Sequence, residues 1–446
     1  MSFSLIETLA IAAGGILLGK GLARIFPLLR ELCLPEPVLG GLLLCVLFSL
    51  SEILGAQPLQ FDLTLQTPLM IAFFLSIGWM ASWKHLKAGG PDVVKFFLLC
   101  AVILVSQNVI GMGLAKALGQ NPLVGALAGS VSMAGGPGTA LAFAPAFEKA
   151  GVVGAGPIGT AAALAGIIMG GVLGSPMAAR LIKRFQLHAG PAGFGSGKKA
   201  EMIESPISLA GHPDMDMGNL MNHLKFFFLV MALGAVVGQW IQKSGITLPI
   251  YIGAMIVAAL LRNWHDLGRG GAHKIKLSHE WIEELGSIAL SYFLVTATMT
   301  LQLKQLAGLA TVLVVILAVQ AVWIWILGSW LVFRFFGKNY DAAVIGAGFT
   351  GFMLGTTANA MANLNAVTKR YGPAPRAYLV VPLVGACGTD FVNAGVITAI
   401  LAFFRLMVGR VDYHLATMRM VGRLSRTHGR RKVAVTTGIK FVANIL

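Results

Sequence analysis

The sequence predicts an all-α polytopic membrane protein made of two inverted repeats, each with five transmembrane helices and one re-entrant hairpin. Three observations support this fold class. The 446-residue chain is 56% apolar and only 12% charged, whereas a soluble domain carries about 25% charged residues. Two interrupted, polar stretches occupy matching positions in the two halves. Lysine and arginine are concentrated in alternate loops, which is typical of proteins oriented by cytoplasmic positive charge.

Apolar runs of about 20 residues can cross a bilayer as helices, and the chain contains ten of them. The first run is expected to be a retained span, because Glu7 stands where a signal peptide has a basic region and no basic residue precedes Lys20. Two interrupted segments, at 122–147 and 341–366, come in addition. The predicted spans are 5–23, 37–55, 67–83, 93–115, 157–179, 224–242, 247–262, 284–301, 309–333 and 377–404.

The two halves are predicted to be repeats of one unit. Pro37–Gly41 resembles Pro249–Gly253, and two further matches keep the same order at offsets of 212 to 219 residues. With five spans and one hairpin in each half, the second half inserts upside down relative to the first. The predicted organisation is a first repeat at 1–180, a cytoplasmic linker at 181–222, a second repeat at 223–407 and a basic C-terminal tail at 408–446.

The basic residues predict the orientation of the chain. With the N-terminus outside, the loops predicted to lie outside hold only Lys116, Lys149, Lys243 and Lys304, and the loops predicted inside hold many more cations. The net charge of +16 is therefore explained by cytoplasmic loops rather than by nucleic-acid binding. The basic tail is the exception, because ten spans place it outside. A membrane-surface helix and an irregular segment are both open for it.

Asp390 is the only acidic residue near the middle of a predicted span. An ionised carboxylate inside the bilayer is costly unless it faces a partner or a wet cavity, so such a residue is a functional candidate. Asn393 follows one helical turn later and can face the same cavity. The alternative is that these side chains only join helices through hydrogen bonds. Gln107, Asn108 and Gln320 are most simply explained in that way.

The interrupted segments provide a second set of candidates. Gly135–Thr139 and Gly355–Asn359 combine glycine with proline, hydroxyl or amide side chains, which suits the end of one half-helix and the start of another. A half-helix that begins inside the membrane presents free N–H groups and about half a positive charge, which suit a carboxylate. One that ends there presents carbonyl oxygens, which suit Na⁺. This pattern favours a transporter, and close glycine packing between helices is the alternative.

Other protein classes fit the sequence less well. It contains neither a zinc-binding His-Glu-x-x-His motif nor a serine-nucleophile elbow, so an enzyme is not expected. An ion channel also uses interrupted helices and is the more remote alternative. The cysteines fall in or beside apolar runs without metal spacing and are predicted to be small core residues, namely Cys33, Cys45, Cys100 and Cys387.

Six motifs occur in order along residues 1–405, namely Leu34–Gly41, Asp62–Phe74, Leu86–Gly90, Gly129–Thr139, Gly337–Ala343 and Val380–Gly385. In these motifs the chain resembles the bacterial sodium/glutamate symporter family. The resemblance implies Na⁺-coupled import of L-glutamate across the bacterial inner membrane by a homodimer. It also implies alternating access of the elevator type, in which a transport unit carries the substrate against a scaffold unit.

The resemblance and the interrupted segments together suggest where glutamate and sodium bind. Glutamate is expected to place its carboxylates at the two tips, while Asp390 balances its ammonium group or helps to bind Na⁺. The chain departs from the family pattern beside the tips, at Pro137, Phe349, Thr350 and Ala358, so another small organic anion such as a dicarboxylate is the alternative substrate. The residues predicted to bind substrate are Gly136, Gly138, Thr139, Thr356, Thr357, Asn359, Asp390 and Asn393, and those predicted to bind Na⁺ are Asp390, Ser132, Thr357 and Asn108.

Overall fold

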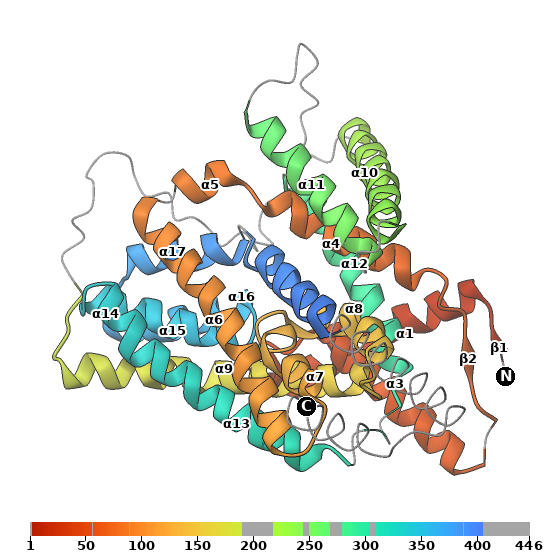
Figure 1. The fold of residues 1–446 in the computed structure, drawn as a ribbon, viewed down its shortest axis with the longest axis horizontal. Coiled ribbons are helices and arrows are strands. Elements are labelled where there is room, and N and C mark those ends of the chain that lie inside the picture. The colour runs from red at the N-terminus through yellow and green to blue at the C-terminus, as the bar shows by residue number, and fades with distance from the viewer. Residues whose placement is uncertain are drawn as a thin grey trace, which may run out of the picture. The chain divides into compact units, whose positions relative to one another are not determined.

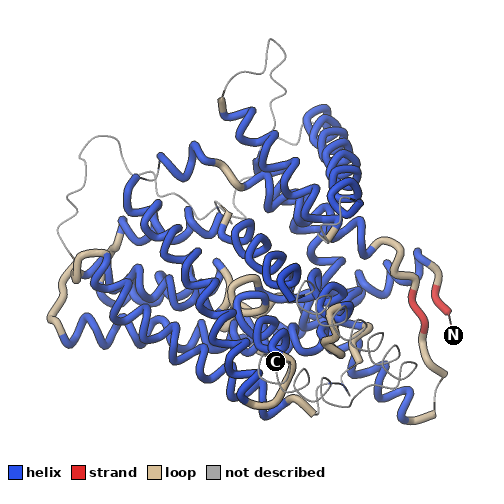
Figure 2. Tube along the Cα trace, in the orientation of Figure 1, coloured by secondary structure: helices blue, strands red, loops and turns tan. Residues whose placement is uncertain are grey.

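The computed structural model describes residues 2–55, 57–88, 90–189, 217–243, 249–267, 279–302, 305, 308–386 and 388–404. Within these ranges the chain is almost entirely helical, which confirms the predicted all-α class (Figures 1 and 2). Residues 1–397 form one compact unit and residues 398–446 a second. Most of the predicted linker and all of the predicted C-terminal tail lie outside the described residues.

The helices of the first half agree with the predicted spans, with short additional helices between them. Helix α1 begins with a capping box, in which Ser4 N donates to Glu7 Oε2 at 2.7 Å and Glu7 N donates to Ser4 Oγ at 3.5 Å. Beside it, the two-residue strands β1 (Ser2–Phe3) and β2 (Gln60–Phe61) pair in parallel. The helices are α1 (Leu5–Ile25), α2 (Pro27–Glu31), α3 (Glu36–Ile53), α4 (Gln66–Met80), α5 (Trp83–Ala88), α6 (Gly90–Ala117), α7 (Pro122–Ala126), the π-helical η1 (Leu127–Val131), α8 (Gly136–Lys149) and α9 (Ala155–Arg184).

The second half differs from the prediction in its last span. The segment 377–404 is expected to be one helix, but it bends by 43° between Pro375–Gly385 and Thr389–Phe404. Gly388 lies in this bend at φ +115°, a backbone conformation that no right-handed helix contains. The helices are α10 (Met217–Lys243), α11 (Ile250–Asp266), α12 (His279–Met299), α13 (Ala310–Ile326), the π-helical η3 (Leu327–Val332), α14 (Phe333–Phe335), α15 (Tyr340–Leu354), α16 (Thr357–Tyr371) and α17 (Pro375–Ala386).

Many of these helices are long and apolar enough to cross a membrane. Helices α4 and α11, with 15 and 17 residues, are shorter than the roughly 20 residues of a full span. The bent pair at 375–404 provides one further candidate. Within the described residues, the six clear candidates are Leu5–Ile25, Glu36–Ile53, Gly90–Ala117, Ala155–Arg184, Met221–Lys243 and Ala310–Phe335.

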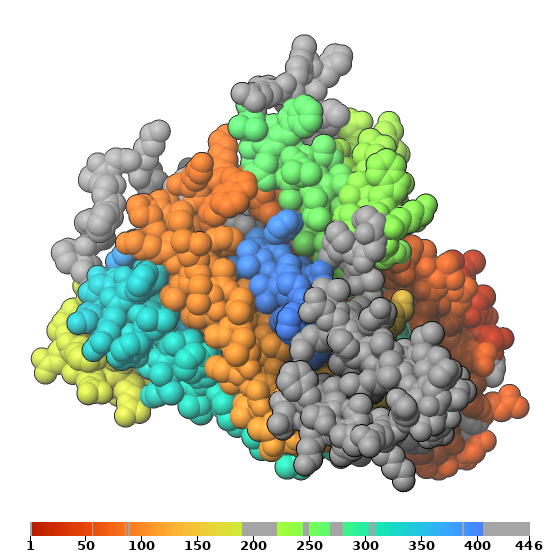
Figure 3. Space-filling model, in the orientation of Figure 1, coloured from red at the N-terminus to blue at the C-terminus, as the bar shows by residue number. Residues whose placement is uncertain are grey.

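Helix α6 illustrates how these candidates meet lipid. Leu98, Val102, Val105 and Val109 follow one another at helical spacing and are each between 45% and 67% exposed. Figure 3 shows α6 as an orange band at the surface of the molecule. A stripe of exposed aliphatic side chains along a helix of 28 residues is what a bilayer requires of its protein neighbours. The chain is therefore a multi-pass membrane protein.

The helices of residues 1–397 divide into two groups according to which helices pack on one another. The unbroken group consists of α1, α3, α4, α10, α11 and α12, and the interrupted group consists of α6 to α9, η1, α13, η3 and α14 to α17. In Figure 1 most of the unbroken group lies at the right and top, and most of the interrupted group lies at the left. Each half of the sequence contributes helices to both groups. The groups touch chiefly where α12 lies against α8 and α9.

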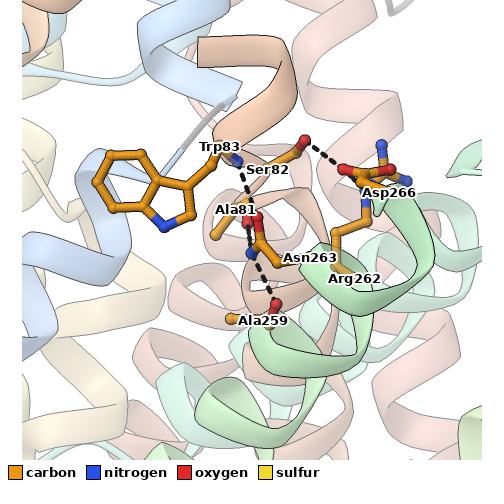
Figure 4. Close-up of polar contacts among 7 residues, drawn as sticks. All are labelled: Ala81, Ser82, Trp83, Ala259, Arg262, Asn263 and Asp266. Carbon is orange, nitrogen blue, oxygen red and sulfur yellow. Dashed lines mark hydrogen bonds and ion pairs between the residues drawn. The ribbon is translucent and has the colours of Figure 1, made fainter. Parts of the chain in front are cut away.

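A polar cluster joins the ends of α4 and α11 within the unbroken group (Figure 4). Trp83 N donates to Asn263 Oδ1 at 2.9 Å, and Asn263 Nδ2 donates to Ala81 O at 2.8 Å. Ser82 Oγ donates to Asp266 Oδ2 at 2.5 Å. These side chains satisfy backbone groups that are set free where α4 ends, and so they hold the two helices together at that end.

Candidate functional site

Each interrupted segment contains a break that is flanked by two helices. In the first segment, Gly129 leaves helical geometry at φ −93° and ψ −131°, and α8 starts at Gly136. In the second, Gly355 (φ −138°, ψ −117°) and Thr356 separate α15 from α16. The predicted tips therefore lie in the breaks, although the first break already starts at Gly129 and not at Gly135.

The two breaks meet each other. Gly136 has φ +67°, which glycine adopts without strain, and a Cβ placed on it would lie 3.4 Å from Thr356 Cγ2. The N-termini of α8 and α16 thus come together, although they are far apart in sequence. Among the described residues, no side chain caps either N-terminus with a hydrogen bond. Two helix ends with free N–H groups and partial positive charge therefore converge, which suits an anion with two acidic groups.

The first break is held by a network of amide and hydroxyl groups. Ser130 Oγ donates to Asn393 Oδ1 at 2.7 Å, and Asn393 Nδ2 donates back to Ser130 O at 3.0 Å. Asn108 Nδ2 donates to Ser130 Oγ at 2.7 Å, while Ser130 N donates to Asn108 Oδ1 at 3.2 Å. All three residues are at most 1% exposed. Asn108 and Asn393 thus position the break, and their amides already have partners inside the protein.

Sequence reasoning did not single out Ser130, which is the centre of this network. The available signal was its place directly after Gly129, the residue at which the helix is interrupted. A hydroxyl at such a point can bond backbone groups that the helix no longer satisfies. Ser132, which was predicted to bind Na⁺, instead donates from Oγ to Leu127 O at 2.5 Å within the same segment.

The second break is held against α9 by two amides from α16. Asn359 Nδ2 donates to Ile167 O at 2.7 Å, and its Oδ1 accepts from Thr356 Oγ1 at 3.2 Å. One turn later, Asn363 Nδ2 donates to Gly170 O at 2.9 Å. Asn359, predicted to bind substrate, therefore faces α9 and fixes the orientation of Thr356. Thr356 is a partly exposed residue at the tip.

The bend in the last span brings Asp390 to the same region. Asp390 lies in the first turn of the helix Thr389–Phe404, one turn before Asn393 and its contact with the first break. On the other side of the bend, a Cβ on Gly385 would lie 2.7 Å from Thr357 Oγ1 at the second break. The Asp390 carboxylate is partly buried, and among the described residues it makes no hydrogen bond or ion pair. An unpaired acid thus lies between elements that touch both breaks.

Similarity to known proteins shows which family the chain belongs to. Residues 1–373 match the family model described as sodium/glutamate symporter. The chain belongs to the sodium/glutamate symporter family. The sodium/glutamate symporter of Escherichia coli (strain K12) is 36% identical over 401 residues, which cover 88% of this chain and 96% of that protein. That of Haemophilus influenzae is 33% identical over 407 residues, which cover 91% and 99%.

Membership of the sodium/glutamate symporter family places the chain among transporters and not among enzymes. The match to the family model includes both breaks and ends before Asp390. Among the described residues, no group of three or more His, Cys, Asp or Glu side chains could hold a metal ion. Sodium sites in transporters are commonly built from backbone carbonyls at interrupted helices, and such carbonyls occur at both breaks.

In this symporter-family fold, Gln107 and Gln320 link the second break to α6 and α13. Gln107 Nε2 donates to Met353 O at 2.9 Å, and Gln320 Nε2 donates to Gln107 O at 2.6 Å. Both amides bridge helices, as the sequence predicted. Both Oε1 atoms are buried and lack a hydrogen-bond partner among the described residues. The unused acceptor of Gln107 therefore remains close to the second break.

The remaining predicted residues lie on the first turn of α8. Thr139 is 4% exposed, and a Cβ on Gly135 would lie 2.8 Å from its Cγ2. A Cβ on Gly138 would lie 3.0 Å from Leu290 Cδ1 of α12 and 3.3 Å from Phe73 Cε1 of α4. The start of α8 thus borders both the facing break and the unbroken group of this symporter-family member.

Proposed function

We propose that the protein imports L-glutamate together with sodium ions by alternating access of the elevator type. The observation that supports this most directly is the meeting of two uncapped helix N-termini at Gly136 and Thr356. L-glutamate has two carboxylates, and each N-terminus offers free N–H groups and about half a positive charge. The relatives named sodium/glutamate symporter support the same substrate and the same coupling ion.

In the proposed binding mode, the carboxylates of glutamate accept from the first-turn N–H groups at Gly136–Thr139 and Thr356–Asn359. The hydroxyls of Thr356 and Thr357, both partly exposed residues, add donors at the second break. Asp390 balances the ammonium group, because its carboxylate has no other partner among the described residues. Pairing the two charges reduces the cost of holding each of them inside the bilayer.

We propose that sodium binds at the Asp390 carboxylate and at oxygen atoms next to it. Asp390 and the Thr357 hydroxyl are the proposed side-chain ligands, together with backbone carbonyls of the breaks. Ser132 and Asn108 hold the shape of the first break, since their side chains already bond Leu127 and Ser130. Coupling follows because glutamate adds a net negative charge near the Asp390 carboxylate, and bound Na⁺ offsets this charge when the carrier moves through lipid.

The proposed moving unit is the interrupted group, and the proposed scaffold is the unbroken group. The two groups meet at α12, where Gly138 of α8 faces apolar atoms of Leu290 and Phe73. An apolar surface of this kind can slide without loss of hydrogen bonds. We further propose inverted repeats, a homodimer and an N-out orientation in the bacterial inner membrane. The family resemblance and the distribution of basic residues support these points.

Another small organic anion, such as a dicarboxylate, is the alternative substrate. The two helix N-termini favour two carboxylates and make no demand for an ammonium group. Asp390 distinguishes the substrates, because an amino acid brings an ammonium group that can pair with its carboxylate, and a dicarboxylate does not. An amino acid with two carboxylates therefore fits the complete site better.

The deciding experiment measures uptake of labelled L-glutamate by purified protein in liposomes, with an inward Na⁺ gradient and with K⁺ in its place. We expect uptake only with Na⁺. Equal uptake under both conditions would remove the coupling claim. A competition panel then compares L-glutamate with dicarboxylates of equal chain length, and stronger inhibition by the dicarboxylates would favour the alternative substrate.

A further inference from the structure

A basic cavity lies between the C-terminal ends of α9 and α16 and has a volume of about 920 Å³. Hydrogen bonds from Asn363 to Gly170 and from Ser175 to Asn363, at 2.9 and 2.7 Å, separate it from the second break. The transport chemistry proposed above therefore does not use this space. Its polar lining consists of Ser175, Arg180, Lys183, Arg184, Arg370 and Tyr371.

Four cationic side chains line the basic cavity, and its lining contains no acidic residue. None of the four forms an ion pair with any residue that the structure describes. The Arg180 guanidinium lies over the Trp325 ring at 5.9 Å, and that of Arg370 lies over the Tyr371 ring at 5.4 Å. Such rings orient a guanidinium by its face, so its N–H donors stay free for an anion.

Helix ends alone do not account for this charge. Both α9 and α16 end here, and each C-terminus contributes about half a negative charge, which attracts basic residues. Basic residues at these ends also fit the predicted cytoplasmic side. Four full positive charges nevertheless exceed the roughly one negative charge of two helix ends. The cavity keeps a positive surplus that a bound anion would balance.

The side chains that line the basic cavity suit a phosphate chemically. Arg180, Arg184 and Arg370 contribute three guanidinium groups to its lining. Arginine binds the oxygens of a phosphate with paired N–H donors, which a lysine ammonium group does not offer.

We propose that the basic cavity binds a phosphate group, and a membrane phospholipid is the source that fits its surroundings. Pro176 and Ala179 give the cavity an apolar side. On the same helix, Val172 and Phe185 are 55% and 51% exposed, so acyl chains can lie along α9. Basic pockets between transmembrane helices are recurrent sites for anionic lipid headgroups. A lipid held there would join α9 to α16, the helix that follows the second break.

The test uses the full-length protein purified in mild detergent and native mass spectrometry with either phosphatidylglycerol or phosphatidylcholine. The wild type is expected to retain phosphatidylglycerol selectively. The cavity variant R180Q/K183Q/R184Q is expected to retain about tenfold less. The matched control, K84Q/K87Q/K95Q, removes three exposed lysines on the same predicted side and is expected to behave as the wild type. Equal retention by the cavity and control variants overturns the lipid assignment.

A second arm distinguishes a lipid from soluble phosphate. In one outcome, inorganic phosphate raises Tm in the wild type and not in the cavity variant, while neither lipid is preferred. That result would support the site and identify soluble phosphate as its ligand. Absence of both effects overturns the proposal. A milder variant serves if the triple variant does not fold. R180K/R184K keeps the charge without the paired donors and is expected to lower retention about threefold. Unchanged retention in this variant overturns the proposal.

Discussion

The two helix groups differ most clearly in the polar side chains that they bury. In the unbroken group, buried hydroxyls such as those of Thr296 and Thr298 bond carbonyls of their own helix. In the interrupted group, buried amides bond the backbone of other helices. Among the described residues, the asparagine and glutamine side chains that are at most 1% exposed belong to the interrupted group or to the helix Thr389–Phe404 that follows it, namely Gln107, Asn108, Gln320, Asn359, Asn363 and Asn393.

This difference follows from the backbone. A continuous helix satisfies its own N–H and C=O groups, so the unbroken group needs only close packing in the membrane. Each break in the interrupted group sets backbone groups free, and a buried amide is stable only where it is hydrogen-bonded. The amides therefore hold the sides of the breaks, while the N-termini of α8 and α16 keep free donors. The fully buried amides thus lie on the side of the molecule that holds the breaks, and the following variants test that division.

Asp390→Asn is expected to have the largest effect, because it removes the unpaired carboxylate that lies between the elements touching both breaks. Loss of one partner of a desolvated charge pair costs roughly 2–5 kcal/mol, so glutamate uptake in liposomes should fall by about 100-fold or more. Folding should be retained, as judged by elution of the detergent-purified protein as a single peak. Glu52→Gln, at an exposed position in α3, is the matched control and should transport normally. Near-normal uptake by Asp390→Asn would remove the acid from the site.

Gly166→Ala tests how closely α9 approaches the second break. Its Cβ would lie 2.3 Å from Leu354 O, so the backbone must move, at a cost of about 3 kcal/mol in unfolding free energy. In the unbroken group, the Cβ of Gly19→Ala would lie still closer to a carbonyl, at 1.9 Å from Glu36 O, whereas that of Gly21→Ala would meet open space.

Chemical denaturation in mixed micelles and the KM for glutamate separate these variants. Both Gly166→Ala and Gly19→Ala should lose stability, and Gly21→Ala should not. Only Gly166→Ala should also raise KM, since it alone displaces a break. A similar change of KM in Gly19→Ala would contradict the confinement of binding to the interrupted group.

Ser130→Ala tests the network at the first break and is expected to cost about 2 kcal/mol, because it leaves the buried Asn393 Oδ1 without its donor. The matched control is Ser51→Ala in the unbroken group. There the hydroxyl donates to Phe48 O of its own helix at 2.7 Å, and its loss should cost well under 1 kcal/mol. Denaturation curves for the two variants give the comparison, and equal midpoints would show that Ser130 has no special role.

Composition alone locates the two interrupted segments, although the first break starts six residues before the predicted tip. Gly135–Thr139 and Gly355–Asn359 stand out because glycine, proline, hydroxyl and amide side chains are rare in apolar spans. The isolated Asp390 was visible for the same reason. The bend before Thr389 was missed, since Gly385 and Gly388 lie in an apolar run that also suits a continuous helix.

The partners of the amides could not be predicted. Asn359 and Asn393 stand beside candidate ligand groups in sequence, and an amide in that place can bind a ligand or bridge helices. The choice depends on residues that are distant in the chain, since Asn393 bonds Ser130 and Asn359 bonds Ile167. The meeting of Gly136 with Thr356 is a further long-range contact that local pattern does not contain. Local composition thus predicted breaks, and only the packed structure assigned each polar group its partner.

Ser82→Ala, in the polar cluster of the unbroken group, is expected to have the smallest effect. It removes the donor to Asp266 at 2.5 Å, but Asp266 keeps Arg262 at 3.1 Å, so the cost should be about 1 kcal/mol. Ser291→Ala in α12 is the control, because its hydroxyl only bonds its own helix. KM for glutamate should stay unchanged in both, since neither residue touches a break. A changed KM for glutamate in Ser82→Ala would mean that the contact between α4 and α11 influences the binding site. The two groups would then not be separate in function.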